Sequence, residues 1–426
     1  MTIKWFPLIA LLVVNFGFDL WLFRKFRRDK KWPRLKSGAH AVLSLVLLAM
    51  MVVAISIPRR QCDNGTFVAI MWMMYIYYTF YVPRYLAALV WMPTHLKKSG
   101  KLTRKIGGIA ATTLGVLVFI YMWVGLLVTP YHVNVTRVEL EFENLPEEFD
   151  GYRIVQFSDT HLGTYNGGKT DFIQECVDSI NALNPDMICF TGDLVSRQSS
   201  EALPYKKILS TLHAPDGVIS ILGNHDDGHY FDWPNEQAKQ ADLQALIDLQ
   251  KDMGWKVLQN ENFILKRDSS EMAVVGTKSF LGWPFPRWGN LDTAYVDYDT
   301  SNLFVVLLQH SPDEWKLDWA YQKRVIMVRL CDKADLMLSG HTHAMQCMVT
   351  LFGYKFSPAC LANDFWGGLY TEGDHKLYVN IGTGMVGMPA RLGTAYPEIT
   401  LITLKKRGEC VIGDDGRTKK KYRVKG

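Results

Sequence analysis

Four long apolar stretches dominate the first third of the chain. They cover residues 5–23, 38–57, 66–85 and 108–129. Each is close to the roughly 20 residues that an α-helix needs to cross the hydrocarbon core of a membrane. The pattern predicts a transmembrane region of four helices over residues 1–130. A cleaved signal peptide explains the first stretch less well, because Lys4 is its only leading charge and no small-residue cleavage site follows.

Lysine and arginine are unevenly divided among the loops of this region. The loop 24–36 carries eight of them and the loop 93–107 carries five, whereas the loop 58–65 carries two. Loops rich in Lys and Arg stay in the cytoplasm, so the N-terminus and everything after residue 129 should lie outside it. We therefore expect a multi-pass protein of the cell membrane with an extracytoplasmic domain. The net charge of +5 reflects topology, and we expect no nucleic-acid partner.

Short hydrophobic runs typical of buried strands recur in the rest of the chain. They lie at 153–157, 187–190, 218–222, 305–308 and 336–338, and helical patterns at 170–183 and 201–213 separate the first three. Strands that alternate with helices predict a layered α/β domain.

A short polar motif follows each of these runs. In chain order the motifs are Asp159-x-His161, Gly192-Asp193, Gly223-Asn224-His225-Asp226, His310 and Gly340-His341-x-His343. The carboxyl ends of strands are where α/β sheets place their sites. Carboxylate, amide and imidazole groups without a thiolate suit Mn, Fe or Zn in a catalytic site. The seven cysteines show no CxxC spacing, which argues against a zinc ribbon.

The ordered motifs resemble those of the calcineurin-like metallophosphoesterases, most closely the bacterial membrane-anchored members. The resemblance also includes the segments 145–163, 387–392 and 397–404, and it covers roughly residues 137–405. It implies two packed β-sheets flanked by helices, a four-layer αββα sandwich. A metallophosphoesterase domain would then occupy residues 131–405, followed by a basic tail at 406–426.

The resemblance assigns roles to the motif residues. It gives one ion to Asp159, His161 and His343, a second ion to Asn224, His310 and His341, and the bridging position to Asp193. The two divalent ions would be Mn, Fe or Zn, with Mn favoured, and a hydroxide held between them would attack phosphorus. His225 would donate a proton to the departing oxygen.

The chain departs from the family pattern in two ways. Many relatives carry a second aspartate where this chain has Ser196, so another group must orient His225. Asp226 or Asp227 is the expected substitute, and Asp226 is a second catalytic candidate. Relatives also often have two glycines where this chain has Ala344 and Met345.

The leading hypothesis is a membrane-anchored hydrolase of phosphomonoesters or phosphodiesters, with a lipid-linked substrate favoured by the anchor. A pyrophosphatase acting on UDP-2,3-diacylglucosamine is the first alternative, and an outside-facing domain argues against it. An inactive scaffold with the same fold is the second alternative, although all seven ligands are present.

Two aromatic loops are candidates for contact with lipid. One holds Trp283, Phe285 and Trp288, and the other holds Phe365 and Trp366. Aromatic side chains favour the membrane interface, although ordinary loop packing is the commoner explanation.

Overall fold

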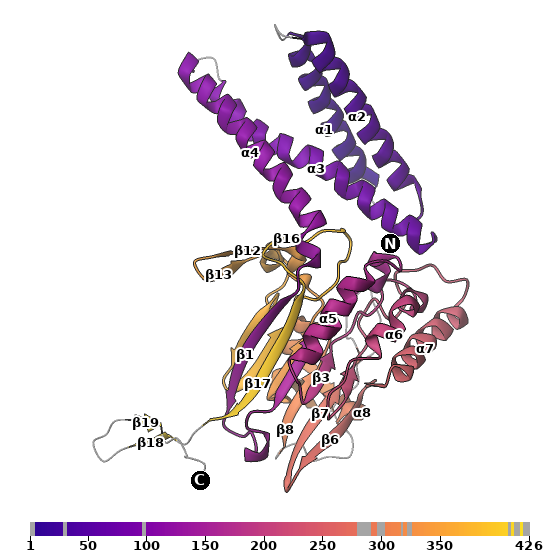
Figure 1. Ribbon diagram of the computed structural model, residues 1–426, viewed down its shortest axis with the longest axis vertical. Coiled ribbons are helices and arrows are strands. Elements are labelled where there is room, and N and C mark those ends of the chain that lie inside the picture. Colours follow the sequence, from indigo (N-terminus) through magenta and orange to yellow (C-terminus); the bar gives the residue numbers. More distant parts are fainter. Residues whose placement is uncertain are drawn as a thin grey trace. The chain divides into compact units, whose positions relative to one another are not determined.

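The structure is a computed structural model of the 426-residue chain, and it divides into two compact units. It describes residues 5–28, 32–95, 99–278, 291–295, 303–316, 318–321, 326–407, 410–412 and 418–420. The first unit comprises Met1–Val124 and Gly387–Pro389, and the second comprises Gly125–Val386 and Ala390–Gly426. The first is built from helices and the second from β-sheets with covering helices (Figure 1).

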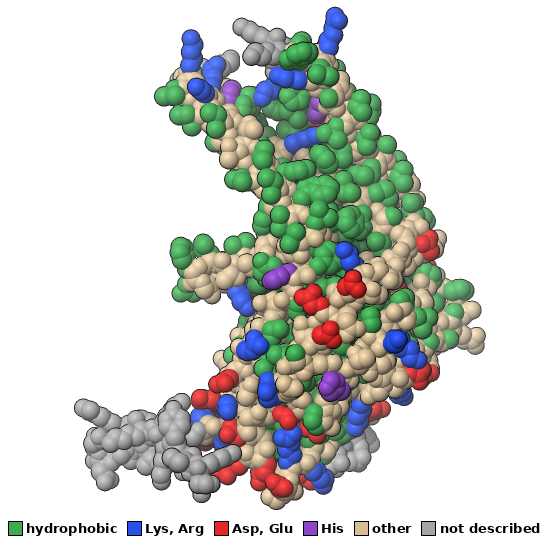
Figure 2. Space-filling model, in the orientation of Figure 1, with side chains coloured by type: hydrophobic (Ala, Val, Ile, Leu, Met, Phe, Trp, Pro, Cys, Tyr) green, Lys and Arg blue, Asp and Glu red, His purple; other side chains and the backbone are tan. Residues whose placement is uncertain are grey.

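Long helices form where the apolar stretches predicted them. They are α1 (Trp5–Arg27), α2 (Pro33–Ser56), α3 (Asn64–Thr94) and α4 (Lys101–Leu127), whose last turn belongs to the second unit. Within the described residues, three spans are long and apolar enough to cross a membrane: Pro33–Ser56, Asn64–Thr94 and Lys101–Tyr131. The prediction of four apolar spans therefore holds for three of them. Hydrophobic side chains cover much of the outer surface of these helices (Figure 2).

A buried acidic side chain joins the first three helices. Asp19 of α1 accepts a hydrogen bond from the Tyr81 hydroxyl of α3. Its carboxylate also lies 3.5 Å from the guanidinium of Arg84 and 3.6 Å from Nε2 of His40 on α2. A charge in an apolar bundle is tolerated only with such partners, so this network fixes how α1 packs on α2 and α3.

The second unit contains two six-stranded sheets. The first has the order β1 (Asn134–Phe142), β17 (Glu398–Lys406), β2 (Arg153–Phe157), β3 (Met187–Phe190), β4 (Val218–Ser220) and β5 (Trp255–Val257). The second has the order β14 (Gly368–Glu372), β15 (His375–Val379), β11 (Leu336–Ser339), β8 (Phe304–Leu308), β7 (Ser270–Gly276) and β6 (Glu261–Arg267). The strands β2 to β5 run parallel to one another, as do β7, β8, β11 and β15. The strand β17 is antiparallel to β2, β6 to β7, and β14 to β15.

Alternate residues of the central strands face different cores. Ile154 of β2 packs in a buried cluster with Val306 of β8 and Leu338 of β11, which joins the two sheets face to face. The next residue, Val155, packs instead against Phe172 of α5. Because both faces of these strands are covered, their sequences read as continuous hydrophobic runs.

Helices and short strands complete the unit. The helices are α5 (Thr170–Ala182), α6 (Lys206–Leu209), α7 (Glu236–Asp252) and α8 (Leu291–Ala294). The remaining strands are β9 (Asp318–Tyr321), β10 (Ile326–Arg329), β12 (Cys347–Leu351), β13 (Tyr354–Phe356), β16 (Leu392–Gly393), β18 (Cys410–Ile412) and β19 (Thr418–Lys420). Asn235 precedes the helix α7, and its side chain caps the helix by accepting the N–H of Ala238 at 2.8 Å.

Candidate metal centre

Loops at the carboxyl ends of five strands bring the seven candidate ligands together. Asp159 and His161 follow β2, Asp193 follows β3, Asn224 follows β4, His310 follows β8, and His341 and His343 follow β11. Two of these strands belong to the second sheet and three to the first. The candidate site therefore lies where the ends of both sheets meet.

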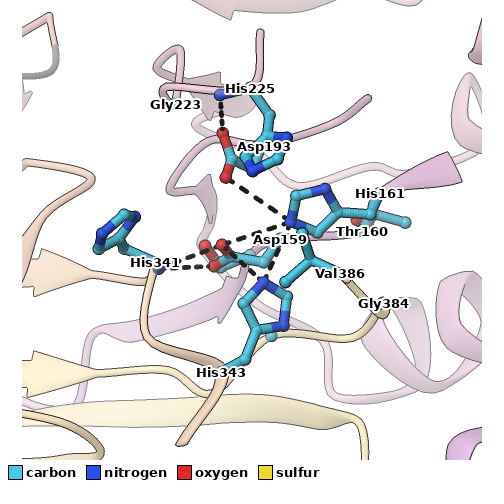
Figure 3. Close-up of polar contacts among 12 residues, drawn as sticks. Asp159, Thr160, His161, Asp193, Gly223, His225, His341, His343, Gly384 and Val386 are labelled. Atoms are coloured by element: carbon cyan, nitrogen blue, oxygen red, sulfur yellow. Dashed lines mark hydrogen bonds and ion pairs between the residues drawn. The ribbon is translucent and has the colours of Figure 1, made fainter. Parts of the chain in front are cut away.

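One group of side chains converges around Asp159. The Nε2 atoms of His161 and His343 are 3.0 Å apart. Oδ1 of Asp159 lies 3.3 Å from Nε2 of His343 and 4.0 Å from Nε2 of His161. All three side chains are buried and point toward one another (Figure 3). Three potential ligand atoms thus surround one point.

A second group converges around Asn224. Its Oδ1 lies 3.1 Å from Nε2 of His310 and 3.0 Å from Nδ1 of His341. The Nδ1 of His310 lies 2.7 Å from the Thr191 carbonyl, which orients the ring so that Nε2 faces the site.

Asp193 lies between the two groups. Its Oδ2 is 3.2 Å from Nε2 of His310 and 3.6 Å from Nε2 of His161. Its Oδ1 accepts the backbone N–H of His225 at 2.8 Å. A carboxylate in this position can contact a cation in either group.

The donor set fits divalent metal ions. Among the described residues, three overlapping groups of His and Asp each bring ligand atoms within 4.8 Å of one another. They are Asp159, His161 and His343; His161, Asp193 and His225; and Asp193, His310 and His341. Oxygen and imidazole ligands without thiolate suit Mn, Fe or Zn.

The protonation states of three of the ligands also favour metal binding. Burial lowers the pKa of His161 well below its ordinary value, and burial together with the charge of His310 lowers the pKa of His341 to about 4. Burial alone would raise the pKa of Asp193, but His310 and His225 outweigh it and hold that pKa well below its ordinary value. Neutral imidazole and ionised carboxylate are the forms that bind metals.

Burial also lowers the pKa of His310, but the Asp193 carboxylate beside it more than reverses this and raises the pKa to about 10. The extra proton lies on Nε2, which faces Asp193 and is the nitrogen that a cation would need. Metal binding here should therefore release a proton.

The backbone is strained at the ligands. The φ angles are positive at Asp159 (51°), His161 (44°), Asp193 (61°), His341 (74°) and His343 (50°). Residues other than glycine rarely adopt this region, and such strain concentrates at functional sites. Gly223 is needed for a related reason, since a Cβ at this position would collide with the carboxylate of Asp193.

His225 lies at the edge of the first group. Its ring stacks on Tyr230, with centroids 3.9 Å apart and planes 6° apart, and meets His161 edge-on at 4.7 Å. Its Nδ1 lies 2.7 Å from the carbonyl oxygen of Ser196. These contacts fix the ring beside the ligands without using its Nε2.

Comparison with known proteins identifies the family of this chain. The family model of the calcineurin-like phosphoesterases matches residues 152–345. The metallophosphoesterase YkuE of Bacillus subtilis is 30% identical over 283 residues, which cover 65% of this chain and 87% of YkuE. The chain belongs to the calcineurin-like phosphoesterase family. It is therefore a hydrolase of phosphoric esters.

Two further relatives of this phosphoesterase have names that state a location or a substrate. A transmembrane protein with a metallophosphoesterase domain from Danio rerio is 30% identical, over 70% of this chain and 64% of its own length. The UDP-2,3-diacylglucosamine pyrophosphatase LpxG of Chlamydia trachomatis is 28% identical, over 64% of this chain and 90% of LpxG. The three apolar spans and the likeness to the Danio rerio transmembrane protein indicate that this phosphoesterase is a membrane protein.

The partner of His225 differs from the sequence expectation. The backbone carbonyl of Ser196, at the position of the missing aspartate, holds the Nδ1 atom of His225. Buried Glu201 fixes this loop by accepting the N–H of Ser196 at 2.6 Å. Every residue offers a carbonyl, so the sequence could not reveal this substitution.

Asp226 contacts the backbone rather than His225. One oxygen accepts the N–H groups of Asp193 (2.8 Å) and Gly223 (2.9 Å), and the other accepts those of Leu194 (2.9 Å) and Val195 (3.2 Å). The carboxylate thereby joins the loop after β3 to the loop after β4. This arrangement points to a positioning residue.

We expect Asp226→Asn to lower the free energy of unfolding by about 3 kcal/mol, because an amide has one acceptor oxygen and leaves buried N–H groups unsatisfied. Thermal unfolding of the metal-free protein in detergent measures the effect. Asp227→Asn, at the next and only partly buried position, is the control and should change stability less. Equal losses in the two variants would show that the four hydrogen bonds do not matter.

The two positions where relatives often have glycine are strained here. Ala344 and Met345 have φ angles of 50° and 48°, in the left-handed region. A side chain in this region costs about 1–2 kcal/mol. Glycine removes that cost, which explains why it is common at such positions.

We expect Met345→Gly to raise the free energy of unfolding by about 0.5 kcal/mol, because relief of strain exceeds the added entropy of the unfolded chain. Met345 is 44% exposed, so little packing is lost. The melting temperature measures the change, with Met348→Gly in the regular strand β12 as the destabilised control. A fall in stability at position 345 would mean that its side chain makes a contact worth more than the strain.

Arg391 is a site residue that sequence reasoning missed. It is fully buried, and its guanidinium donates to the carbonyls of Ile381 (3.0 Å), Gly382 (2.8 Å) and Gly384 (2.6 Å). Burial lowers its pKa to about 10, so it remains charged at neutral pH. It holds this loop against Asp159, whose carbonyl accepts the N–H of Gly384 at 2.8 Å. Its place in the family segment 387–392 was the only signal of a role.

Proposed function

We propose that this chain is a dinuclear metal phosphoesterase that hydrolyses phosphomonoesters or phosphodiesters. The observation that carries the proposal is Asp193, whose carboxylate lies within 3.6 Å of imidazoles from both ligand groups. A carboxylate is the natural bridge between two ions about 3.5–4 Å apart. Asp159, His161 and His343 would hold one ion with Asp193, and Asn224, His310 and His341 would hold the other. Mn is favoured over Fe and Zn.

The roles of the chain's own groups follow from their positions. Bound divalent ions supply a nucleophile at neutral pH by lowering the pKa of water, and they neutralise phosphoryl charge. His225 presents Nε2 beside the ligands while Nδ1 is held by Ser196. Because Nδ1 donates its hydrogen to the Ser196 carbonyl, the ring gives a proton from Nε2 to the oxygen that leaves phosphorus only in its imidazolium form. Burial lowers the pKa of His225 and the Asp193 carboxylate opposes that effect. Asp226 and Arg391 keep the ligand loops in place.

We further propose four membrane-spanning helices, a metallophosphoesterase domain at 131–405 with four αββα layers, and a basic tail at 406–426. The packed sheets and the α5 layer support the sandwich. Most of the tail lies outside the described residues. The distribution of Lys and Arg supports an extracytoplasmic domain. A phosphatase reporter fused after residue 426 tests this orientation, because it would be active outside the cytoplasm and inactive inside.

A lipid-linked phosphoester is the substrate class that the membrane anchor favours. A pyrophosphate-linked lipid is a second candidate, supported by the likeness to LpxG over 90% of its length. An extracytoplasmic domain argues against a nucleotide-sugar substrate, because such substrates are cytoplasmic.

Hydrolysis of bis-p-nitrophenyl phosphate and p-nitrophenyl phosphate by the full chain in detergent tests the proposed reaction. We expect turnover with Mn that EDTA abolishes and Mn restores, and the ratio of the two rates distinguishes diesterase from monoesterase. Bound metal without turnover of either ester with Mn, Fe, Zn or Co would argue for the inactive scaffold.

A further inference from the structure

An apolar hairpin projects from the second unit, directly after the loop that carries His343 of the candidate metal centre. It is formed by β12 and β13, which pair antiparallel around the two-residue turn Phe352-Gly353 (Figure 1). Only one of the two aromatic loops that were candidates for lipid contact lies within the described residues. Trp283, Phe285 and Trp288 lie outside the described residues, whereas Phe365 and Trp366 pack against buried clusters.

The two faces of the hairpin differ in chemistry. One face carries the cross-strand pairs Val349 with Phe356 and Leu351 with Tyr354, and the other carries Thr350 with Lys355. The four side chains of the first face are between 47% and 71% exposed. Hydrophobic side chains gather on this projection in Figure 2. A continuous exposed apolar face of this kind marks an interaction surface.

The tip strengthens this interpretation. Phe352 is 91% exposed and has a φ of 50°, and Gly353 has a φ of 84°. A turn with two positive φ angles favours Asn or Asp followed by Gly, so a bulky Phe is strained there. Leu361, shortly after the hairpin, is 88% exposed. The turn is therefore locally strained, and its aromatic ring is exposed to solvent.

Another hairpin of the same unit carries charged side chains instead of apolar ones. The strands β6 and β7 meet at the two-residue turn Asp268-Ser269. Around this turn Lys266 pairs with Glu271 at 2.6 Å, and Arg267 pairs with Asp186 at 3.0 Å. A water-exposed hairpin in this unit thus carries charges, whereas β12–β13 carries apolar groups.

The base of the hairpin lies close to the point where the chain leaves its last apolar helix. The strand β12 pairs with β16 through Cys347 and Leu392. The residue before β16, Arg391, donates its N–H to the carbonyl of Gly125 at 2.8 Å. Gly125 lies in the last turn of α4, within the span Lys101–Tyr131. The hairpin base is therefore connected through β16 to the residue at which the second unit begins.

The hairpin is also continuous with the metal centre. His343 precedes the start of β12 by four residues. Gln346 donates to the carbonyl of Ala390 at 2.7 Å, and Ser357, just after β13, donates to the carbonyl of Ala344 at 2.6 Å. Both ends of the hairpin are therefore tied to the loop that carries His343.

We propose that the β12–β13 hairpin inserts Phe352 and its apolar face into the interfacial layer of the membrane. The metal centre then takes phosphoesters whose acyl chains remain in the bilayer, a substrate class that rests on the function proposed above. Aromatic and aliphatic side chains beside a lysine are the composition that binds this layer.

Photocrosslinking tests the docking without depending on turnover. The photoreactive residue benzoylphenylalanine replaces Phe352 in the full chain, which is reconstituted in phosphatidylcholine nanodiscs. The control carries the same residue in place of Asp268, in the charged turn. We expect a phospholipid adduct at position 352 and none at 268. Adducts at 352 with a second copy alone, or no lipid adduct, would overturn the proposal.

Phe352→Asn tests the substrate class and suits the turn, so the fold is retained. We expect about tenfold slower hydrolysis of hexadecyl p-nitrophenyl phosphate in the bilayer, the effect of losing one buried aromatic side chain. Hydrolysis of soluble ethyl p-nitrophenyl phosphate should be unchanged, and Asp268→Asn should affect neither ester. Equal losses on both esters would overturn the role in lipid presentation. A wild-type chain that cleaves neither ester would instead contradict the proposed function, and the crosslink would still decide the docking.

Discussion

Replacing Asp193 by Asn is expected to lower kcat/KM for a phosphodiester by at least about 10³-fold. The Asp193 carboxylate lies between the two ligand groups, with Nε2 of His310 at 3.2 Å and Nε2 of His161 at 3.6 Å. Asparagine keeps the volume and one oxygen but removes the charge and the second anionic donor. Two cations brought close together would then repel each other without compensation.

The same variant should lose metal as well as activity. We expect bound Mn to fall from about two ions per chain to one or fewer, because the bridge belongs to both sites. Asp335→Asn is the matched control, since Asp335 is a largely buried carboxylate at the opposite, amino end of β11. Asp335→Asn should retain both metal and turnover. Full activity in Asp193→Asn would exclude a bridging role.

Replacing His225 by Gln should slow the hydrolysis of esters with alkyl leaving groups by about 10²–10³-fold, the usual contribution of a general acid. Alkoxides are poor leaving groups and need a proton as the bond to phosphorus breaks. The p-nitrophenolate ion leaves without one, so p-nitrophenyl esters should lose less than about tenfold. The ring is held at 2.7 Å from the Ser196 carbonyl, which leaves Nε2 available for this transfer.

The dependence on the leaving group separates proton donation from a structural role. A series of phosphodiesters with leaving groups of increasing basicity should show a steeper decline in rate for His225→Gln than for the wild-type chain. His213→Gln is the control and should follow the wild type, because His213 is an exposed residue whose ring nitrogen Nδ1 lies 3.1 Å from the Thr211 carbonyl, far from any ligand strand end. A uniform loss across the series would assign His225 to positioning or metal binding instead.

The sequence predicted the elements that place the site, because strand patterns and turn motifs are local. The runs before Asp159, Asp193 and Asn224 became β2, β3 and β4, and the structure brings the three side chains to one sheet edge. Hydrophobic periodicity alone could not distinguish one sheet from two. That distinction came from the family resemblance, because facing sheets such as those joined by Ile154 and Val306 require contacts between distant segments.

Features that depend on the backbone or on distant contacts escaped prediction. The partner of His225 is a main-chain carbonyl, and Asp226 binds main-chain N–H groups, so neither residue type identified the contact. Arg391 bonds to carbonyls that only the folded loop assembles. The exposed hairpin was missed because Val349, Leu351 and Phe356 have the pattern of an ordinary strand.

Metal titration of the apoprotein tests the central claim most directly. The metal-free full chain in detergent is titrated with Mn while bound metal and turnover of bis-p-nitrophenyl phosphate are measured on the same samples. We predict two ions per chain and turnover that rises with the second equivalent. Full turnover at one equivalent, or two bound ions with no turnover, would contradict a dinuclear phosphoesterase.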